Sequence, residues 1–301
     1  MNLQSTSPER LMRWATYASV SVASLLIATK FMAWLATDSI SLMSTLIDST
    51  LDAAASLINL IAVRHALEPA DREHRFGHGK AEALAGLAQS AFIAGSAVFL
   101  LFEAGQRVVN PRAIGNSNLG YAVMVFSIVL TVMLVVFQRH VIRRSGSVAI
   151  SADSLHYQTD ILINISVIVS LFLASELGLT WADPVFAAGI AFYIIRSAWQ
   201  IGSEVFQILM DRELPEEDRQ RVREIVITEP GVIGMHDLRT RSSGTQVFIQ
   251  LHLQLDGEMK LKDAHRIADS VELKIAAAFE NAEVIVHQDP DGVDEDQSVF
   301  L

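Results

Sequence analysis

Cysteine is absent from all 301 residues of the sequence. This absence excludes disulfide bonds, thiolate metal sites and thiol redox chemistry. A metal ion bound by this chain must be held by histidine, aspartate or glutamate, a ligand set that favours Zn²⁺, Fe²⁺, Mn²⁺ or Cd²⁺ over Cu⁺.

Positive charge is also scarce, since the chain has 23 basic residues and 34 acidic ones, which gives a net charge of −11. This balance argues against a nucleic-acid partner. Residues 1–208 carry 14 acidic and 13 basic side chains, whereas residues 209–301 carry 20 and 10. We therefore predict an apolar, nearly neutral domain at 1–208, an acidic soluble domain at 209–290 and a disordered acidic tail at 291–301.

Long apolar runs dominate the first domain, and 51% of the whole chain is hydrophobic. Six runs are each about 20 residues or longer, enough to cross a hydrocarbon core of about 30 Å. The first run is too long for the core of a signal peptide, so we expect it to be retained. The predicted spans are 14–36, 39–65, 82–108, 119–141, 148–176 and 182–208.

Basic residues orient these spans, because cytoplasmic loops of membrane proteins are enriched in lysine and arginine. One side of the predicted topology has only Arg107 and Arg112. Both termini are therefore predicted to be cytoplasmic. The opposite side collects Arg10, Arg13, Arg64, Arg72, Arg75, Lys80, Arg139, Arg143 and Arg144.

Two polar pairs interrupt the apolar spans, Asp48 with Asp52 and His156 with Asp160. Residues four apart share one face of a helix. Asp48 and His156 each lie about 14 Å into the bilayer at 1.5 Å per residue, so the pairs are predicted to meet near the midplane. Three carboxylates and one imidazole suit tetrahedral Zn²⁺. The alternative is a polar clamp between helices, disfavoured because three acids repel one another without a cation. Lys30 is interpreted as a structural or snorkelling side chain.

The loop after the second span places Asp71, His74 and His78 three and four residues apart. A helical turn or a wrapped loop could bring them together around a metal ion. A solvated, mixed-charge cytoplasmic loop explains the same residues equally well, and the sequence leaves both interpretations open.

After Leu214 the pattern becomes soluble, with a charged helix at 215–228, strands at 232–241 and 246–255, an amphipathic helix at 261–279 and a strand at 283–287. The order α-β-β-α-β predicts a small α+β domain with helices over one face of a sheet. Its four histidines suggest a metal cluster, although single surface histidines are common. They are His236, His252, His265 and His287, and Asp237 and Asp289 lie close to two of them.

The paired acidic motifs, the segment Phe76-Gly-His-Gly-Lys-Ala-Glu82 and the ending His287-Gln-Asp-Pro290 occur in the order typical of one family. On these motifs the chain resembles the cation diffusion facilitators over nearly its whole length. The resemblance implies an all-α six-helix membrane bundle with a metallochaperone-like cytoplasmic domain, forming a homodimer in the bacterial inner membrane. It also implies proton-coupled export of metal from the cytoplasm.

The same resemblance assigns site residues. It implies a transport site at Asp48, Asp52, His156 and Asp160, and a loop site at Asp71, His74 and His78. A binuclear zinc site is implied at His236, His252, His265, His287 and Asp289. The resemblance implies that His156 favours Zn²⁺ and often Cd²⁺, whereas Asp48, where stricter zinc carriers have histidine, leaves selectivity broader, with Fe²⁺ a further substrate. Zn²⁺ is thus expected as substrate and as a structural or regulatory ion, with no organic cofactor.

The sequence therefore predicts a metal/proton antiporter in contact with membrane lipid, not an enzyme. A passive metal channel is a weaker alternative, and proton coupling separates the two. An intramembrane metallohydrolase is disfavoured, since four protein ligands leave no open position for water and no glutamate lies beside the motif. A metal sensor without transport is a further alternative.

Overall fold

The computed structural model describes residues 7–37, 40–109, 118–177 and 182–292. These residues form two compact units, which divide between Phe206 and Gln207. The expected acidic tail lies almost entirely outside the described residues.

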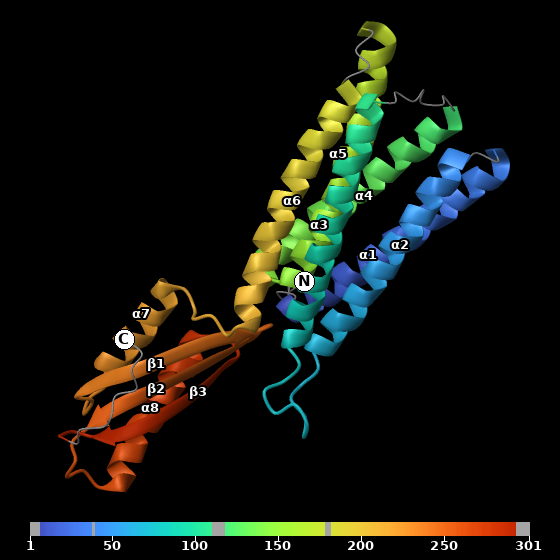
Figure 1. The fold of residues 1–301 in the computed structure, drawn as a ribbon. Helices are drawn as coiled ribbons and strands as arrows, with labels where there is room; N and C mark the ends of the chain where they lie inside the picture. The colour runs from blue at the N-terminus through green and yellow to red at the C-terminus, as the bar shows by residue number, and fades with distance from the viewer. Residues whose placement is uncertain (1–6, 38–39, 110–117, 178–181, 293–301) are drawn as a thin grey trace, which may run out of the picture. The chain divides into compact units, whose positions relative to one another are not determined.

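The first unit is built from long helices that match the predicted spans (Figure 1). Each has 27 to 30 residues, so each is about 40 Å long and exceeds a hydrocarbon core of about 30 Å. Five of them, α1 to α4 and α6, are long and apolar enough to cross a membrane. The bounds are α1 Pro8–Thr37, α2 Ile40–Ala66, α3 Lys80–Val109, α4 Asn118–Ser145, α5 Val148–Leu177 and α6 Ala182–Leu209.

Helix α5 carries Asp153, His156 and Asp160 in its first half and is not among the five candidate spans. It occupies the centre of the unit, in contact with α1, α2, α3 and α4. Its side chains Asp153, His156 and Tyr157 are buried, so these polar residues of α5 point into protein rather than lipid. Polar groups within a membrane are expected to face the bundle interior in this way.

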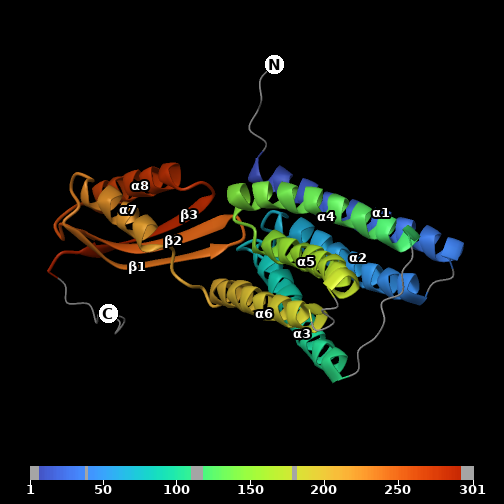
Figure 2. The same cartoon turned by 90° about the horizontal axis from the view of Figure 1, so that it is seen from above.

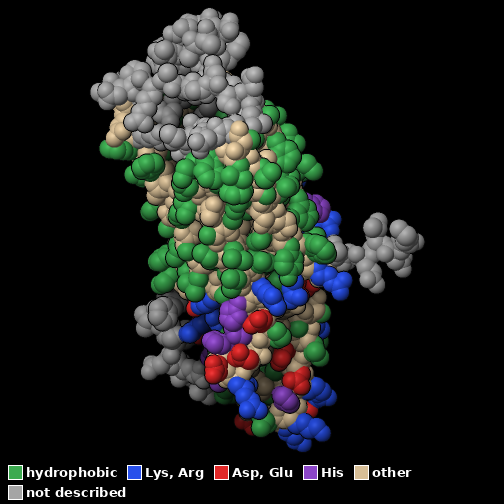
Figure 3. Space-filling view, turned by 90° about the vertical axis from the view of Figure 1, so that its right-hand side faces the viewer, with side chains coloured by type: hydrophobic (Ala, Val, Ile, Leu, Met, Phe, Trp, Pro, Cys, Tyr) green, Lys and Arg blue, Asp and Glu red, His purple; other side chains and the backbone are tan. Residues whose placement is uncertain are grey.

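The outer surface of the helical unit is apolar, as a lipid-facing surface requires. Figure 3 shows hydrophobic side chains covering its visible face. Trp199 is 77% exposed and Phe192 is 67% exposed. Small residues let the helices approach: a Cβ added at Gly86 of α3 would lie 3.3 Å from Val205 of α6.

The second unit has the predicted α-β-β-α-β order. It comprises α7 Glu216–Ile227, β1 Gly234–Ser243, β2 Gln246–Leu255, α8 Leu261–Ala278 and β3 Ala282–Pro290. The central strand β2 pairs antiparallel with β1 and parallel with β3. Both helices cover the same face of the sheet (Figure 2). The core lies between them, where Ile249, Leu251 and Leu253 of β2 meet Val271 and Ile275 of α8.

Candidate metal centres

The first candidate centre lies between α2 and α5. One ligand atom each from Asp52, His156 and Asp160 can be chosen so that all three lie within 4.8 Å of one another. His156 Nε2 and Asp52 Oδ1 are 2.8 Å apart and share a hydrogen bond. His156 and Asp160 project together because they are separated by one turn of α5. The structure thus brings together three of the four residues expected in the transport site.

Asp48, the fourth expected residue, is not part of this triplet. It lies one turn from Asp52 on α2 and its side chain is exposed. Its carboxylate is nevertheless near enough to interact electrostatically with Asp160. Whether Asp48 binds metal together with the triplet remains a prediction.

Lys30 of α1 lies beside the acidic cluster. Its ammonium donates hydrogen bonds to Ser49 Oγ at 2.6 Å and to the carbonyl oxygen of Thr45 at 3.3 Å. It interacts electrostatically with Asp160, Asp52 and Asp48. The Lys30 amine therefore lies next to three carboxylates, a closer relation to the site than a snorkelling side chain would have.

Asp153, which the sequence reasoning did not single out, is held by residues of three other helices. It is 1% exposed. Its Oδ2 accepts from the Ser19 hydroxyl at 2.6 Å and from Gln138 Nε2 at 2.7 Å, and its Oδ1 accepts from Gln89 Nε2 at 3.2 Å. This network ties α1, α3 and α4 to the helix that carries His156, one turn away. Its position inside an apolar span was the available signal.

The second candidate centre is in the irregular loop between α2 and α3. Asp71 Oδ2 lies 3.4 Å from His78 Nε2, and Asp71 Oδ1 lies 3.6 Å from His74 Nδ1. The backbone N–H groups of His74 and Glu73 donate to Asp71 Oδ1, the first of them at 2.6 Å. The bond from His74 is the main cause that lowers the pKa of Asp71 below its ordinary value. The wrapped loop, not a helical turn, brings the three residues together.

The third candidate centre lies on the sheet face opposite α7 and α8. The register pairs His236 of β1 with His252 of β2, and His252 with His287 of β3, so three imidazoles form a row across the strands. As the alternation predicted, Leu251 and Leu253 are buried while His252 points to the other face. Asp289, two residues after His287, joins this row from the same face.

Asp289 is the centre of this cluster and is only 5% exposed. Its Oδ2 lies 2.8 Å from His252 Nδ1 and 3.1 Å from His236 Nε2. Its Oδ1 lies 3.0 Å from His287 Nε2. A nearly buried carboxylate surrounded by imidazoles is a suitable set of ligands for Zn²⁺.

A bulge in β1 shapes the edge of this cluster. The β1–β2 register shifts between His236 and Arg239, and Asp237 within the bulge has φ of +46°. Hydrogen bonding from the Arg239 guanidinium is the main cause that lowers the pKa of Asp237, and the two side chains also form an ion pair at 2.8 Å. The bulge re-aims Asp237, so that its Oδ2 lies 3.7 Å from His252 Nε2.

His265 is not brought to this cluster within the single chain. It lies on α8, where its side chain is 66% exposed and its Nδ1 is 3.5 Å from Asp269. Its expected membership of the binuclear site remains a prediction.

Comparison with known proteins places this geometry in context. The model of the cation efflux transmembrane domain matches residues 16–210, and that of the cation efflux protein cytoplasmic domain matches residues 214–291. A protein of Shewanella oneidensis called cation-efflux pump FieF is 51% identical over 276 residues, covering 92% of this chain and 93% of that protein. A protein of the same name from Cronobacter sakazakii is 49% identical, with 93% of each chain covered. A solved metal-bound C-terminal domain of the CzcD transporter from Thermotoga maritima is 27% identical and covers 27% of this chain and 94% of that one, with a TM-score of 0.26.

Proposed function

Since this chain belongs to the cation efflux family, whose members are metal transporters and not enzymes, we propose that it is a proton-coupled antiporter for Zn²⁺. In this proposal the metal leaves the cytoplasm by alternating access at Asp48, Asp52, His156 and Asp160. Fe²⁺ and Cd²⁺ are further substrates by the same chemistry. The protein is a homodimer in the bacterial inner membrane, with both termini in the cytoplasm.

One observation supports this proposal most strongly, the convergence of Asp52, His156 and Asp160 from two helices of a membrane unit. Ligand atoms bound to one zinc ion at about 2.0–2.2 Å lie roughly 3–3.5 Å apart in a tetrahedral site. The His156–Asp52 separation of 2.8 Å needs only a small adjustment to reach this range. Charged residues in a membrane interior are costly and mark ion pathways.

Proton coupling follows from the hydrogen bond between His156 and Asp52. Without metal, one proton lies between His156 Nε2 and Asp52 Oδ1. The proposal takes His156 in the empty site as an imidazolium, which must lose the shared proton before Nε2 can donate an electron pair to zinc. The reverse exchange, in which protons displace zinc on the far side of the membrane, completes an antiport cycle. A passive channel requires no such exchange, and this difference separates it from the antiporter.

The proposal predicts proton release when zinc binds. Zinc added to the full-length protein in weakly buffered detergent solution should release about one proton or more per ion bound at the membrane site. The change is read with a pH-sensitive dye, with zinc binding measured in parallel. The Asp52→Asn variant, which cannot share the proton in the same way, should release fewer protons. Proton release unchanged in that variant would count against this proton-exchange step.

Lys30 is proposed to serve as an internal counter-cation of the empty site. Its positive charge offsets part of the repulsion among the carboxylates when zinc is absent, and it opposes zinc when the ion arrives. Lys30→Met should therefore tighten zinc binding at the membrane site by at least about tenfold, because the repulsion of one unit charge at about 12 Å already amounts to about 1.4 kcal/mol at an effective dielectric constant of about 20. Lys30→Arg, which keeps the charge, is the control. If Lys30→Met and the parent protein bound zinc at the membrane site with equal affinity, the role of Lys30 would be structural only.

The loop centre is proposed to bind a second metal ion with Asp71, His74 and His78. Because the pKa of Asp71 is lowered, its carboxylate stays ionised as the pH falls. Metal binding to the loop should therefore show no separate carboxylate step down to about pH 4. Cadmium titration of the full-length protein at several pH values, with Asp71→Asn as the comparison, measures this. A distinct loss of affinity between about pH 5 and 4 would contradict it.

The cluster on the soluble unit is proposed to be a regulatory zinc site. Its ligands come from three strands of a rigid sheet, so metal binding there stabilises one arrangement of the domain. The proposed role is to sense cytoplasmic zinc and bring the two soluble domains of the dimer together, with His265 contributing to the binuclear site. A protein that only senses metal would bind zinc here without moving it, whereas the antiporter must do both.

A further inference from the structure

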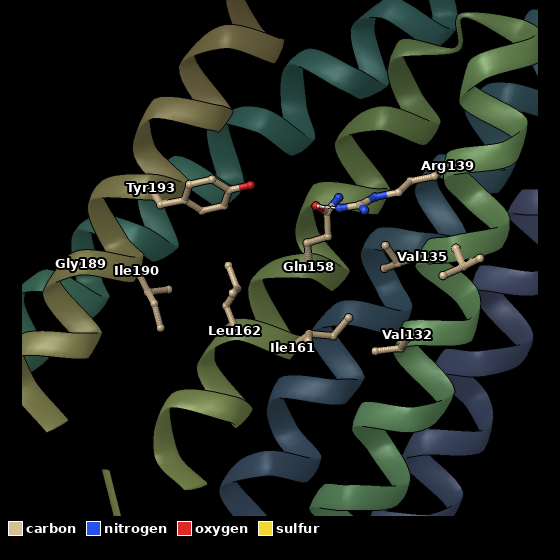
Figure 4. A pocket seen from close by; sticks show the side chains of 10 residues that line it. Val132, Val135, Arg139, Gln158, Ile161, Leu162, Gly189, Ile190 and Tyr193 are labelled. Atoms are coloured by element: carbon tan, nitrogen blue, oxygen red, sulfur yellow. Dashed lines mark hydrogen bonds between the residues drawn. The ribbon is translucent and has the colours of Figure 1, made fainter. Parts of the chain in front are cut away.

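A groove of about 490 Å³ opens between α4, α5 and α6, on the opposite side of α5 from the metal ligands. Its walls are mostly aliphatic, and the polar side chains Arg139, Gln158 and Tyr193 gather at one level (Figure 4). The apolar lining consists of Val132, Val135, Val136, Ile161, Leu162 and Ile190. Because its walls include two apolar spans, α4 and α6, the groove faces the hydrocarbon region of a membrane.

Arg139 lies at the level where lipid headgroups meet the hydrocarbon. Helix α4 is about 42 Å long and Arg139 lies about 9 Å from its end at Ser145. For a helix centred on a core of about 30 Å, the α-carbon of Arg139 is then about 3 Å below the core surface. An arginine side chain reaches past that distance to the phosphates.

The guanidinium of Arg139 has a neutral partner. It donates to Gln158 Oε1 at 2.7 Å, and no carboxylate of the described residues lies within 4 Å of it. Burying arginine near hydrocarbon is costly unless an anion compensates its charge. The Tyr193 ring stands on the opposite wall, so its hydroxyl offers a further donor near the same level.

The groove itself has the depth of an acyl chain segment. Val132 lies two turns from Arg139 on α4, which is about 10 Å deeper in a leaflet of about 15 Å. Gly189 of α6 leaves the groove open, since a Cβ added there would meet no atom within 4 Å. A ligand that matches this groove has an anionic group for Arg139 and an apolar chain for the lining below it. An anionic phospholipid combines these two parts in one molecule.

We propose that this groove is a specific binding site for an anionic phospholipid, with the phosphate on Arg139 and one acyl chain between α4, α5 and α6. Basic pockets between membrane helices bind anionic headgroups in this manner. This lipid site differs from the three metal centres, because its ligand is neither a metal ion nor a proton. Its floor includes Gln158, Ile161 and Leu162 of α5, the helix that also carries His156 and Asp160. A bound lipid therefore contacts the helix that positions the metal ligands.

The absence of cysteine allows a direct test, because a single introduced thiol is labelled without background. Val136→Cys, in the groove wall, is labelled with bimane in the full-length protein and placed in nanodiscs. Brominated phosphatidylglycerol should quench it about fivefold more effectively than brominated phosphatidylcholine, the effect expected for one basic residue near an anionic lipid. Arg139→Gln should abolish the preference, whereas Arg143→Gln, which removes the same charge from the same helix end, should keep it.

A steric variant provides an independent measurement. Gly189→Phe should fill the groove and reduce quenching by both lipids, while Gly95→Phe, at another open glycine on α3, should not. Equal quenching by the two lipids would show an ordinary lipid-exposed surface and overturn the proposal. Loss of quenching by both in the Val136→Cys protein, with cross-linking of the thiol to a second copy, would show that a protein chain covers the groove and would also overturn it.

Discussion

Replacing Asp160 by asparagine is expected to reduce zinc transport in proteoliposomes to the level of empty vesicles. The variant keeps the size of the side chain but removes the charge from a ligand that meets Asp52 and His156. Changes even to groups that only support a metal ligand alter affinity by about 10–100-fold, so loss of a ligand should cost at least about 100-fold. Zinc uptake followed with an internal dye gives the measurement.

The control for this variant is Ser166→Ala on the same helix. Among the described residues, the hydroxyl of Ser166 donates to the carbonyl oxygen of Ile163 at 2.9 Å, a local contact, so transport should stay close to that of the parent protein. Both variants should retain zinc binding on the soluble unit, which shows that the chain is folded. If Asp160→Asn retained more than about one tenth of the parent transport rate, the assignment of Asp160 as a ligand of the transport site would be wrong.

The second large effect is expected at Asp289. Because this carboxylate lies within 3.1 Å of imidazole nitrogens from His236, His252 and His287, Asp289→Asn should weaken zinc binding to the soluble unit by about 100-fold or more. The measurement is a zinc titration of the full-length protein that carries Asp160→Asn and Asp71→Asn, so that neither the membrane site nor the loop centre contributes. Transport by Asp289→Asn alone at saturating zinc should fall much less than binding does.

Asp263→Asn is the matched control, since it removes a carboxylate from an exposed pair with Arg266 on α8 that lies outside the cluster. It should leave the zinc affinity of the soluble unit unchanged. An affinity of Asp289→Asn equal to that of this control would show that the three histidines and Asp289 form a hydrogen-bonded network and not a metal site.

The fold was predictable because its signals are local. Long apolar runs define α1 to α6, and the alternation in β2 separates Leu251 and Leu253 from His252. The expected strand at 283–287 was shorter than β3, which extends over Ala282–Pro290. The added residues include Asp289, whose position on the histidine face depends on that extension.

The sites were predictable only in part, because their details depend on packing. Asp48 and Asp52 share a face of α2, and the spacing could not tell which of them meets His156. In the structure Asp52 is the hydrogen-bond partner of His156. The surroundings of Asp153 could not be foreseen, since its donors Ser19, Gln89 and Gln138 lie on three different helices. The row of three histidines required a strand register that includes a bulge at Asp237.

The most direct test of the antiport proposal is zinc flux across proteoliposomes when the pH gradient is reversed at a fixed zinc gradient. Coupled exchange predicts that zinc moves against the direction of proton flow, so reversing the pH gradient should reverse or strongly slow the zinc flux. The Asp160→Asn variant should show neither response. Zinc flux that follows the zinc gradient alone, at the same rate under both pH gradients, would contradict antiport and indicate a channel.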